Sequence, residues 1–124
     1  MGAFAGAPYP KGPQMTLYGI PTCDTCRKAL AALRAAGLEP VFRDVRAEPL
    51  SPAEIAKIVD EFGSRAINRQ SPSFRSFNAF LRESEPEAQI AAQPTVMKRP
   101  VIEHEGRWFL GWEPEVQAAL LPAG

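Results

Sequence analysis

The sequence contains little cysteine and histidine, and it has no excess of charge of either sign. Two cysteines and one histidine occur among 124 residues, which is too few for a multi-bridge disulfide scaffold or for four zinc ligands of the Cys and His types alone. The 14 basic residues balance the 14 acidic ones, so no strong field favours direct binding of nucleic acid or an anionic membrane. Any preference for anions must come from local groups of residues.

Long apolar runs are absent as well. No segment approaches the roughly 18 consecutive apolar residues that span a bilayer, and residues 1–14 lack the basic and then apolar pattern of a secretory signal. We therefore expect a cytoplasmic protein without membrane association, in which the cysteines are free thiols. The Gly-, Ala- and Pro-rich segment 1–14 is predicted to be a flexible extension, and residues 15–124 a single domain.

The order of the expected elements predicts an α/β fold. A short β-branched and aromatic strand precedes Pro21, an alanine- and leucine-rich helix ends at Gly37, and a second strand follows, which is a βαβ unit with parallel strands. A hairpin and a final helix close the chain. The strands are expected at 16–20, 40–45, 100–103 and 107–110, and the first and last helices at 28–36 and 113–121.

The middle of the chain is expected to be helical. Ser51 and Glu54 form a capping box with Pro52 at the first helical position, and this helix should end near Gly63. The aromatic spacing over 74–81 predicts another short helix, and 87–92 a further turn or two. The sequence therefore predicts a thioredoxin-like mixed sheet, β-α-β then β-β-α, with a helical insertion at about 51–97.

The strongest chemical signal is the pair Cys23 and Cys26, which directly follows the first strand at the start of the first helix. This spacing next to a βαβ unit is typical of a thiol redox motif. Helix N-terminal amides and the nearby Arg27 and Lys28 favour a thiolate at Cys23, whereas Asp24 opposes it. Thr22 or Asp24 is a candidate helix cap.

Other interpretations of the two cysteines stay open. Both can be small buried apolar residues, as free cysteines often are. Zinc is less favoured, because the only histidine, His104, lies in the expected hairpin, and haem attachment fails because Arg27 stands where a histidine is required. Trp108 and Trp112 are expected in the core or at its rim.

A second group of candidate residues is cationic. It comprises Arg65, Arg69, Lys98 and Arg99. The planar guanidinium binds tetrahedral oxyanions, so a thiolate beside such groups suits an arsenate- or phosphate-like species. Alternatively, Arg65 and Arg69 cover one solvated face of a helix end.

The chain resembles the ArsC family, which includes glutathione- and glutaredoxin-linked arsenate reductases and the Spx regulators. The resemblance covers roughly residues 15–121 in the same order along the chain, which makes it far more specific than the two cysteines alone. It rests on segments 17–29 (LYGIPTCDTCRKA), 48–51 (EPLS), 67–69 (INR), 98–100 (KRP) and 110–112 (LGW).

The resemblance implies a thioredoxin-like fold with Cys23 as the nucleophile. It also implies that Arg69 and Arg99 bind an oxyanion and stabilise a thiol-bound arsenic adduct, and that Pro100 is the cis-proline beside the active thiol. Cys26 is then either the residue that resolves the adduct or one half of a thiol/disulfide switch. Glutathione, glutaredoxin or thioredoxin would serve as the reductant, with no metal and no bound cofactor.

Two departures from the arsenate reductases bring the chain closer to the Spx-like branch. Gly19 stands where those reductases have a histidine, and Gly111 near the position of a third arginine. The hypotheses are therefore an arsenate reductase-like enzyme, a reductase of glutathione mixed disulfides, and an Spx-like switch that binds RNA polymerase. A family member with an inert Cys pair is a further alternative, which predicts ordinary thiol reactivity.

Overall fold

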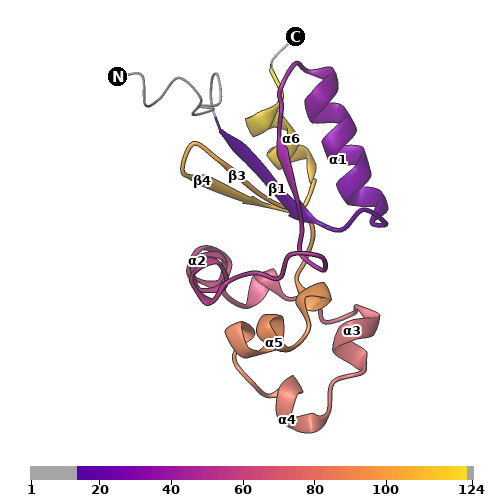
Figure 1. The fold of residues 1–124 in the computed structure, drawn as a ribbon, viewed down its shortest axis with the longest axis vertical. Helices are drawn as coiled ribbons and strands as arrows, with labels where there is room; N and C mark the ends of the chain where they lie inside the picture. The colour runs from indigo at the N-terminus through magenta and orange to yellow at the C-terminus, as the bar shows by residue number, and fades with distance from the viewer. Residues whose placement is uncertain (1–13, 123–124) are drawn as a thin grey trace, which may run out of the picture.

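A four-stranded mixed sheet forms the centre of the fold (Figure 1). The structure is a computed structural model and describes residues 14–122. The strands lie in the order β2-β1-β3-β4; β1 is parallel to β2, and β3 is antiparallel to both β1 and β4. Their bounds are Met15–Gly19 for β1, Val41–Asp44 for β2, Val101–His104 for β3 and Arg107–Leu110 for β4. The predicted α/β, thioredoxin-like sheet is confirmed.

Helices α1 (Asp24–Ala35) and α6 (Pro114–Leu120) pack together with alternate residues of β1. Figure 1 shows both helices on the same side of the sheet. Because side chains alternate along a strand, Leu17 faces these helices and its neighbour Tyr18 faces the other core cluster. The core on the α1 side comprises Met15, Leu17, Cys26, Ala29, Leu33, Ile102, Val116 and Leu120.

The chain between β2 and β3 is mostly helical, and apart from α2 its helices are short. Figure 1 shows this segment at one end of the sheet. The α-helices are α2 (Pro52–Phe62), α3 (Pro72–Arg75), α4 (Ala79–Arg82) and α5 (Pro86–Ala92), and the 3-10 turns are η2 (Gly63–Ala66) and η3 (Pro94–Val96). Their buried residues join Tyr18 and Val101 in the second core cluster, so this segment and the sheet share a core.

The helix predicted over 74–81 is wrong, because two single-turn helices occupy this stretch. The Ser71 hydroxyl accepts a hydrogen bond from the Phe74 amide and starts α3, whereas the Asn78 side chain accepts from the Leu81 amide and starts α4. Helix α3 ends at Arg75, and the Asn78 cap starts a separate helix. The aromatic spacing therefore does not mark one apolar face, and Phe80 is 78% exposed.

Residues 1–13 and 123–124 lie outside the described part of the chain. The expected flexible extension at 1–14 is therefore described at Gln14 alone. Over residues 14–122, no helix has both the length and the apolar character needed to cross a membrane.

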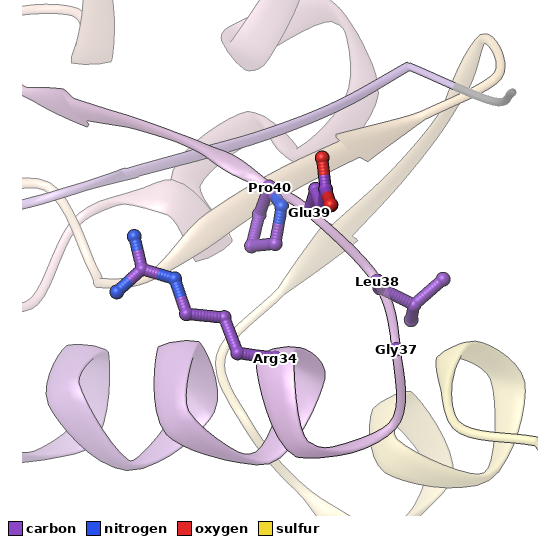
Figure 2. A pocket seen from close by; sticks show the side chains of 5 residues that line it. All are labelled: Arg34, Gly37, Leu38, Glu39 and Pro40. Carbon is purple, nitrogen blue, oxygen red and sulfur yellow. The ribbon is translucent and has the colours of Figure 1, made fainter. Parts of the chain in front are cut away.

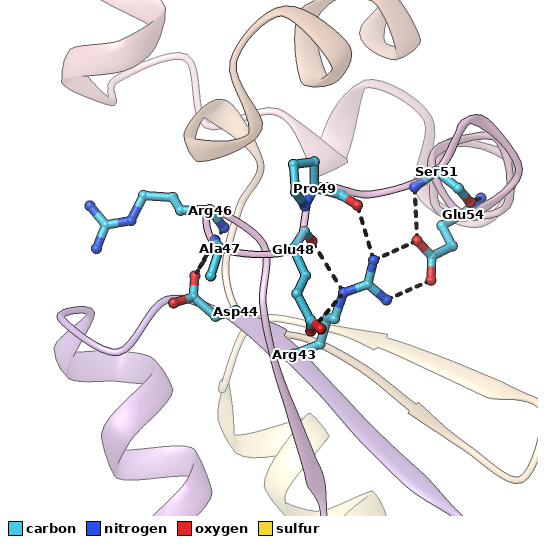
Figure 3. A network of polar contacts seen from close by, with 8 residues as sticks. All are labelled: Arg43, Asp44, Arg46, Ala47, Glu48, Pro49, Ser51 and Glu54. Atoms are coloured by element: carbon cyan, nitrogen blue, oxygen red, sulfur yellow. Dashed lines mark hydrogen bonds and ion pairs between the residues drawn. The ribbon is translucent and has the colours of Figure 1, made fainter.

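Arg43 joins the sheet to the beginning of α2 (Figure 3). Its guanidinium donates two hydrogen bonds to the Glu54 carboxylate, at 2.8 and 2.9 Å, and one each to the backbone carbonyls of Glu48 and Pro49. The same carboxylate accepts from the Ser51 amide at 2.8 Å, and the Ser51 hydroxyl accepts from the Glu54 amide. The predicted capping box is confirmed, and it is also an anchor for β2.

We expect Glu54→Gln to lower the free energy of unfolding by about 1–2 kcal/mol at pH 7, because the bidentate ion pair is lost. The hydrogen bond from Arg43 holds the pKa of Glu54 below its ordinary value, against the opposing effect of burial. That stabilisation is present above the unfolded-state pKa of about 4.3 and disappears as the pH falls through the lower folded-state pKa. Urea unfolding at neutral and acidic pH measures both effects.

The matched control is Glu61→Gln, which removes an exposed carboxylate from the same helix. It should leave stability nearly unchanged. Equal losses in the two variants, or an acid dependence in Glu54→Gln as steep as in the unmodified protein, would contradict the assignment.

Candidate active site

Two loops meet at one end of the sheet because of the strand register. Tyr18 near the end of β1 pairs with Val101 at the start of β3. The residues that follow β1 and those that precede β3 therefore lie at the same end of the sheet. Cys23 belongs to the segment after β1, and Pro100 directly precedes β3. The Arg99–Pro100 peptide bond is cis, which confirms the predicted cis-proline.

Cys23 is the N-cap residue of α1. Its amide donates to the Ile20 carbonyl at 3.2 Å, and its own carbonyl accepts from the Arg27 amide at 3.0 Å. No side-chain cap bond is present, so Thr22 and Asp24 do not cap this helix as proposed. Asp24 instead lies in the first helical turn and binds the Arg27 guanidinium.

The pKa of the Cys23 thiol lies below its ordinary value. Partial burial raises this pKa, but hydrogen bonds from the Cys26 amide and the Cys26 thiol lower it, as do the hydrogen bond and the positive charge of Arg99. The direction agrees with the prediction from the sequence. The cation that lowers this pKa is Arg99, however, and not Arg27 or Lys28. The Arg27 guanidinium is paired with Asp24.

Cys26 is fully buried in the first turn of α1. Burial is the main cause that raises the pKa of its thiol to about 12, and the neighbouring Cys23 raises it further, while the Ile20 backbone and the Arg99 charge lower it. The two thiols therefore differ in acidity: Cys23 loses its proton at a lower pH than an ordinary thiol, and Cys26 at a higher pH. Such a pair has one nucleophile and one proton donor.

We expect iodoacetamide to add once to the folded protein, at Cys23, with a midpoint pH below the value of about 8.5 of an ordinary thiol. Peptide mass spectrometry over a pH series measures this. In Cys26→Ala the midpoint should move upward, because the Cys26 thiol no longer donates to the Cys23 thiolate. Equal labelling of both cysteines in the folded protein would be the contrary result.

Arg99 is held by the backbone of the segment that precedes it. Its Nη1 donates to the carbonyls of Thr95 and Met97, at 2.6 and 3.2 Å. Among residues 14–122, its buried Nε has no hydrogen-bond partner. A guanidinium that is fixed in place, near a thiolate, with a donor still unused can bind an anionic group. The sequence analysis did not identify Thr95, because it belongs to no motif and acts through its backbone carbonyl, which only the fold brings to Arg99.

Arg69 packs on an aromatic ring. Its guanidinium is 5.1 Å from the centre of the Phe74 ring, and Arg65 stacks likewise on Phe62. Both arginines line a cavity of about 440 Å³ whose lining includes Lys98 but neither Cys23 nor Arg99. The complete lining is Arg65, Ile67, Asn68, Arg69, Gln70, Lys98 and Leu110.

Arg65 and Arg69 are both exposed, as expected for a solvated basic surface, but they do not share one helix end. Arg65 belongs to the 3-10 turn η2, and Arg69 lies beyond it, outside any helix. Lys98, which lines the cavity with Arg65 and Arg69, is the neighbour of Arg99 in the chain. Gly111, near the place of a third family arginine, has a φ of 80°, a conformation that disfavours any side chain there.

Other parts of the surface offer less chemistry. A cavity of about 470 Å³ at the C-terminal end of α1 is lined by residues of the α1–β2 connection, Arg34, Gly37, Leu38, Glu39 and Pro40 (Figure 2). It contains no cysteine. His104 contacts Gln14 and Glu105, and residues 14–122 hold no cluster of three metal-ligating side chains of the His, Cys, Asp and Glu types. Trp108 is partly buried and stacks on Tyr18.

Comparison with known proteins gives the family. The model of the ArsC family matches residues 18–120. The chain belongs to the ArsC family. Among its relatives, the global transcriptional regulator Spx of Listeria innocua is 32% identical over 115 residues, which are 87% of each chain.

Solved structures of ArsC-family relatives agree with this assignment. The YFFB protein superposes with a TM-score of 0.80 at 32% identity, covering 88% of this chain and all of that one. An arsenate reductase (ArsC) related protein from Brucella melitensis gives a TM-score of 0.66 at 28% identity, covering 89% of this chain and 97% of the other. This ArsC chain is thus similar both to regulators and to proteins related to arsenate reductase.

Proposed function

We propose that this ArsC-family protein is a thiol-dependent oxidoreductase that reduces arsenate, with Cys23 as its nucleophile. The observation that carries the proposal is the pairing of Cys23 with Arg99. The pKa of the Cys23 thiol is lowered in part by Arg99, and the Arg99 guanidinium retains a donor without a partner among residues 14–122. Thiolate and cation together favour attack on a centre that carries negatively charged oxygens.

In the proposed reaction, the Cys23 thiolate attacks arsenic and forms a sulfur–arsenic bond, and one arsenate oxygen leaves as water after protonation. A second thiol, from glutathione or Cys26, then attacks the Cys23 sulfur. The sulfur–arsenic bond breaks, its electron pair stays on arsenic, and arsenite leaves. Two thiols are oxidised to one disulfide, and As(V) is reduced to As(III). Glutathione, glutaredoxin or thioredoxin reduces that disulfide.

The cationic cavity supports a second substrate for the same nucleophile. Arg65, Arg69 and Lys98 line a space of about 440 Å³, and carboxylates are natural ligands of such groups. We propose that it receives a carboxylate of glutathione when Cys23 attacks a glutathione mixed disulfide. Arg69 would then bind the substrate from this cavity, while Arg99 and Pro100 contribute beside the thiol.

The test is turnover by the purified protein. Arsenite formation is measured with arsenate and either glutathione plus glutaredoxin or thioredoxin as reductant, and glutathione release is measured from a mixed disulfide in a parallel assay. Arsenite formation supports arsenate reduction. Release from the mixed disulfide alone supports the glutathione reaction in its place. If neither arsenite nor glutathione is formed, the proposal of an enzyme is contradicted.

A second candidate is a redox-switched regulator that binds RNA polymerase. It is favoured by the similarity to Spx over 87% of both chains and by the interaction between the Cys23 and Cys26 thiols. Affinity capture of purified bacterial RNA polymerase by the oxidised and the reduced protein tests it. Binding by only one redox form supports the switch, and no binding by either form contradicts it.

A further inference from the structure

Gly19 and Cys26 are in such close contact that no side chain fits at position 19 while the Cys26 side chain keeps its place. A Cβ atom placed on Gly19 would come closer than 3.0 Å to the Cys26 Sγ and lie 3.3 Å from its Cβ. Real Cβ atoms essentially never approach another heavy atom so closely. The backbone of Gly19 does not have a positive φ. Glycine is therefore required here because a side chain would clash with Cys26, and not because of a special backbone conformation.

Both partners in this contact are fixed. Gly19 is the last residue of β1, its register partner is Asp44, and its carbonyl accepts from the Val45 amide at 3.0 Å. Cys26 lies in the first turns of α1 and is fully buried. A displaced Sγ would therefore have to enter occupied core, because the interior is closely packed.

We propose that Gly19 is a positioning residue for the Cys26 thiol, holding open the space in which Sγ lies next to Cys23. This inference rests on the proposed function only in that it assigns Cys26 to the resolving step. In that step a Cys23–glutathione mixed disulfide is attacked by the Cys26 thiolate. The Cys23–Cys26 disulfide forms, the bond to the glutathione sulfur breaks, and glutathione leaves with the electron pair and takes up a proton.

Formation of the mixed disulfide itself prepares Cys26 for this step. Burial is the main cause that raises the pKa of the Cys26 thiol; the charge of the Cys23 thiolate raises it further, whereas Arg99 lowers it. Once Cys23 is bonded to another sulfur, its charge is gone and the effect of Arg99 remains. The position of the Cys26 Sγ then decides how fast it reaches the Cys23 sulfur.

The experiment measures glutathione release from a preformed Cys23–glutathione mixed disulfide of the purified protein. We expect Gly19→Ala to slow release by about 10- to 100-fold. A displaced Cys26 Sγ is no longer aligned with the Cys23 sulfur that it must attack, and small misplacements of a reacting atom cost rates of this order. Release at the unmodified rate would overturn the proposal. Thr25→Ala, an exposed change between the two cysteines, is the control and should release glutathione normally.

A double-mutant cycle separates the steric contact from a general loss of stability. Gly19→Ala should lower the thermal unfolding midpoint in the unmodified background and lower it much less in Cys26→Ala, where Sγ is absent and the remaining neighbours lie at 3.3 and 3.4 Å. If Gly19→Ala folds only together with Cys26→Ala, the contact is supported. If the cost is the same in both backgrounds, or neither variant folds, Cys26 is not the residue that requires Gly19. Neither readout uses arsenate, so each is independent of arsenate turnover.

Discussion

Replacing Cys23 by serine is expected to lower arsenate turnover by at least about 10³-fold, because a serine hydroxyl is neither a thiolate nor able to form a disulfide. The pKa of the Cys23 thiol is already held below its ordinary value by Cys26 and Arg99, and a hydroxyl in the same place stays protonated. Arsenite formation under saturating reductant measures the loss. Full activity of Cys23→Ser would exclude Cys23 as the nucleophile.

Cys26→Ser distinguishes the two ways of resolving the adduct. With thioredoxin as reductant, the reaction needs a second thiol in the protein, so turnover should fall nearly as far as in Cys23→Ser. With excess glutathione, an external thiol can attack the Cys23 adduct, and much of the activity should return. Equal loss with both reductants would instead indicate that Cys26 matters for the folded structure, where it is fully buried.

Much of the architecture could be predicted from local patterns. The strands, the parallel β1–β2 pair, the capping box at Ser51 and the helix end near Gly63 depend on residues close together in the sequence, and the structure contains them. The prediction of one helix over 74–81 was wrong because it, too, used only local spacing. Its aromatic spacing is local, but the break comes from the side chain of Asn78, which caps a new helix.

The chemistry of the site was less accessible from the sequence, because it depends on residues far apart in the chain. The sequence places Arg27 and Lys28 beside Cys23, yet the cation that lowers the pKa of its thiol is Arg99, which the sheet register brings to the same edge. The fit between Gly19 and Cys26 likewise requires the strand and helix to be in position. The basic residues next to Cys23 in the sequence are thus a poor guide to the cation that lowers the pKa of its thiol.

Arg99→Gln is expected to lower kcat/KM for arsenate by about 10²-fold, the usual loss when one preorganised group that stabilises developing charge is removed. Two consequences combine. The pKa of the Cys23 thiol rises, since the hydrogen bond and charge of Arg99 both lower it, and the substrate oxygens lose their cation. The pH profile of iodoacetamide labelling isolates the first effect, and arsenite formation at a pH where Cys23 is fully ionised isolates the second.

Arg99→Lys and Arg27→Gln make this prediction specific. Lysine keeps the positive charge but lacks the planar fork that donates to Thr95 and Met97, so the labelling midpoint should shift less than in Arg99→Gln while turnover still falls. Arg27→Gln removes an arginine adjacent to Cys26 in sequence whose guanidinium is bound to Asp24, and both readouts should stay unchanged. If Arg27→Gln shifted the midpoint as far as Arg99→Gln, the thiolate would be stabilised by the charge of the helix start and not by the guanidinium beside Pro100.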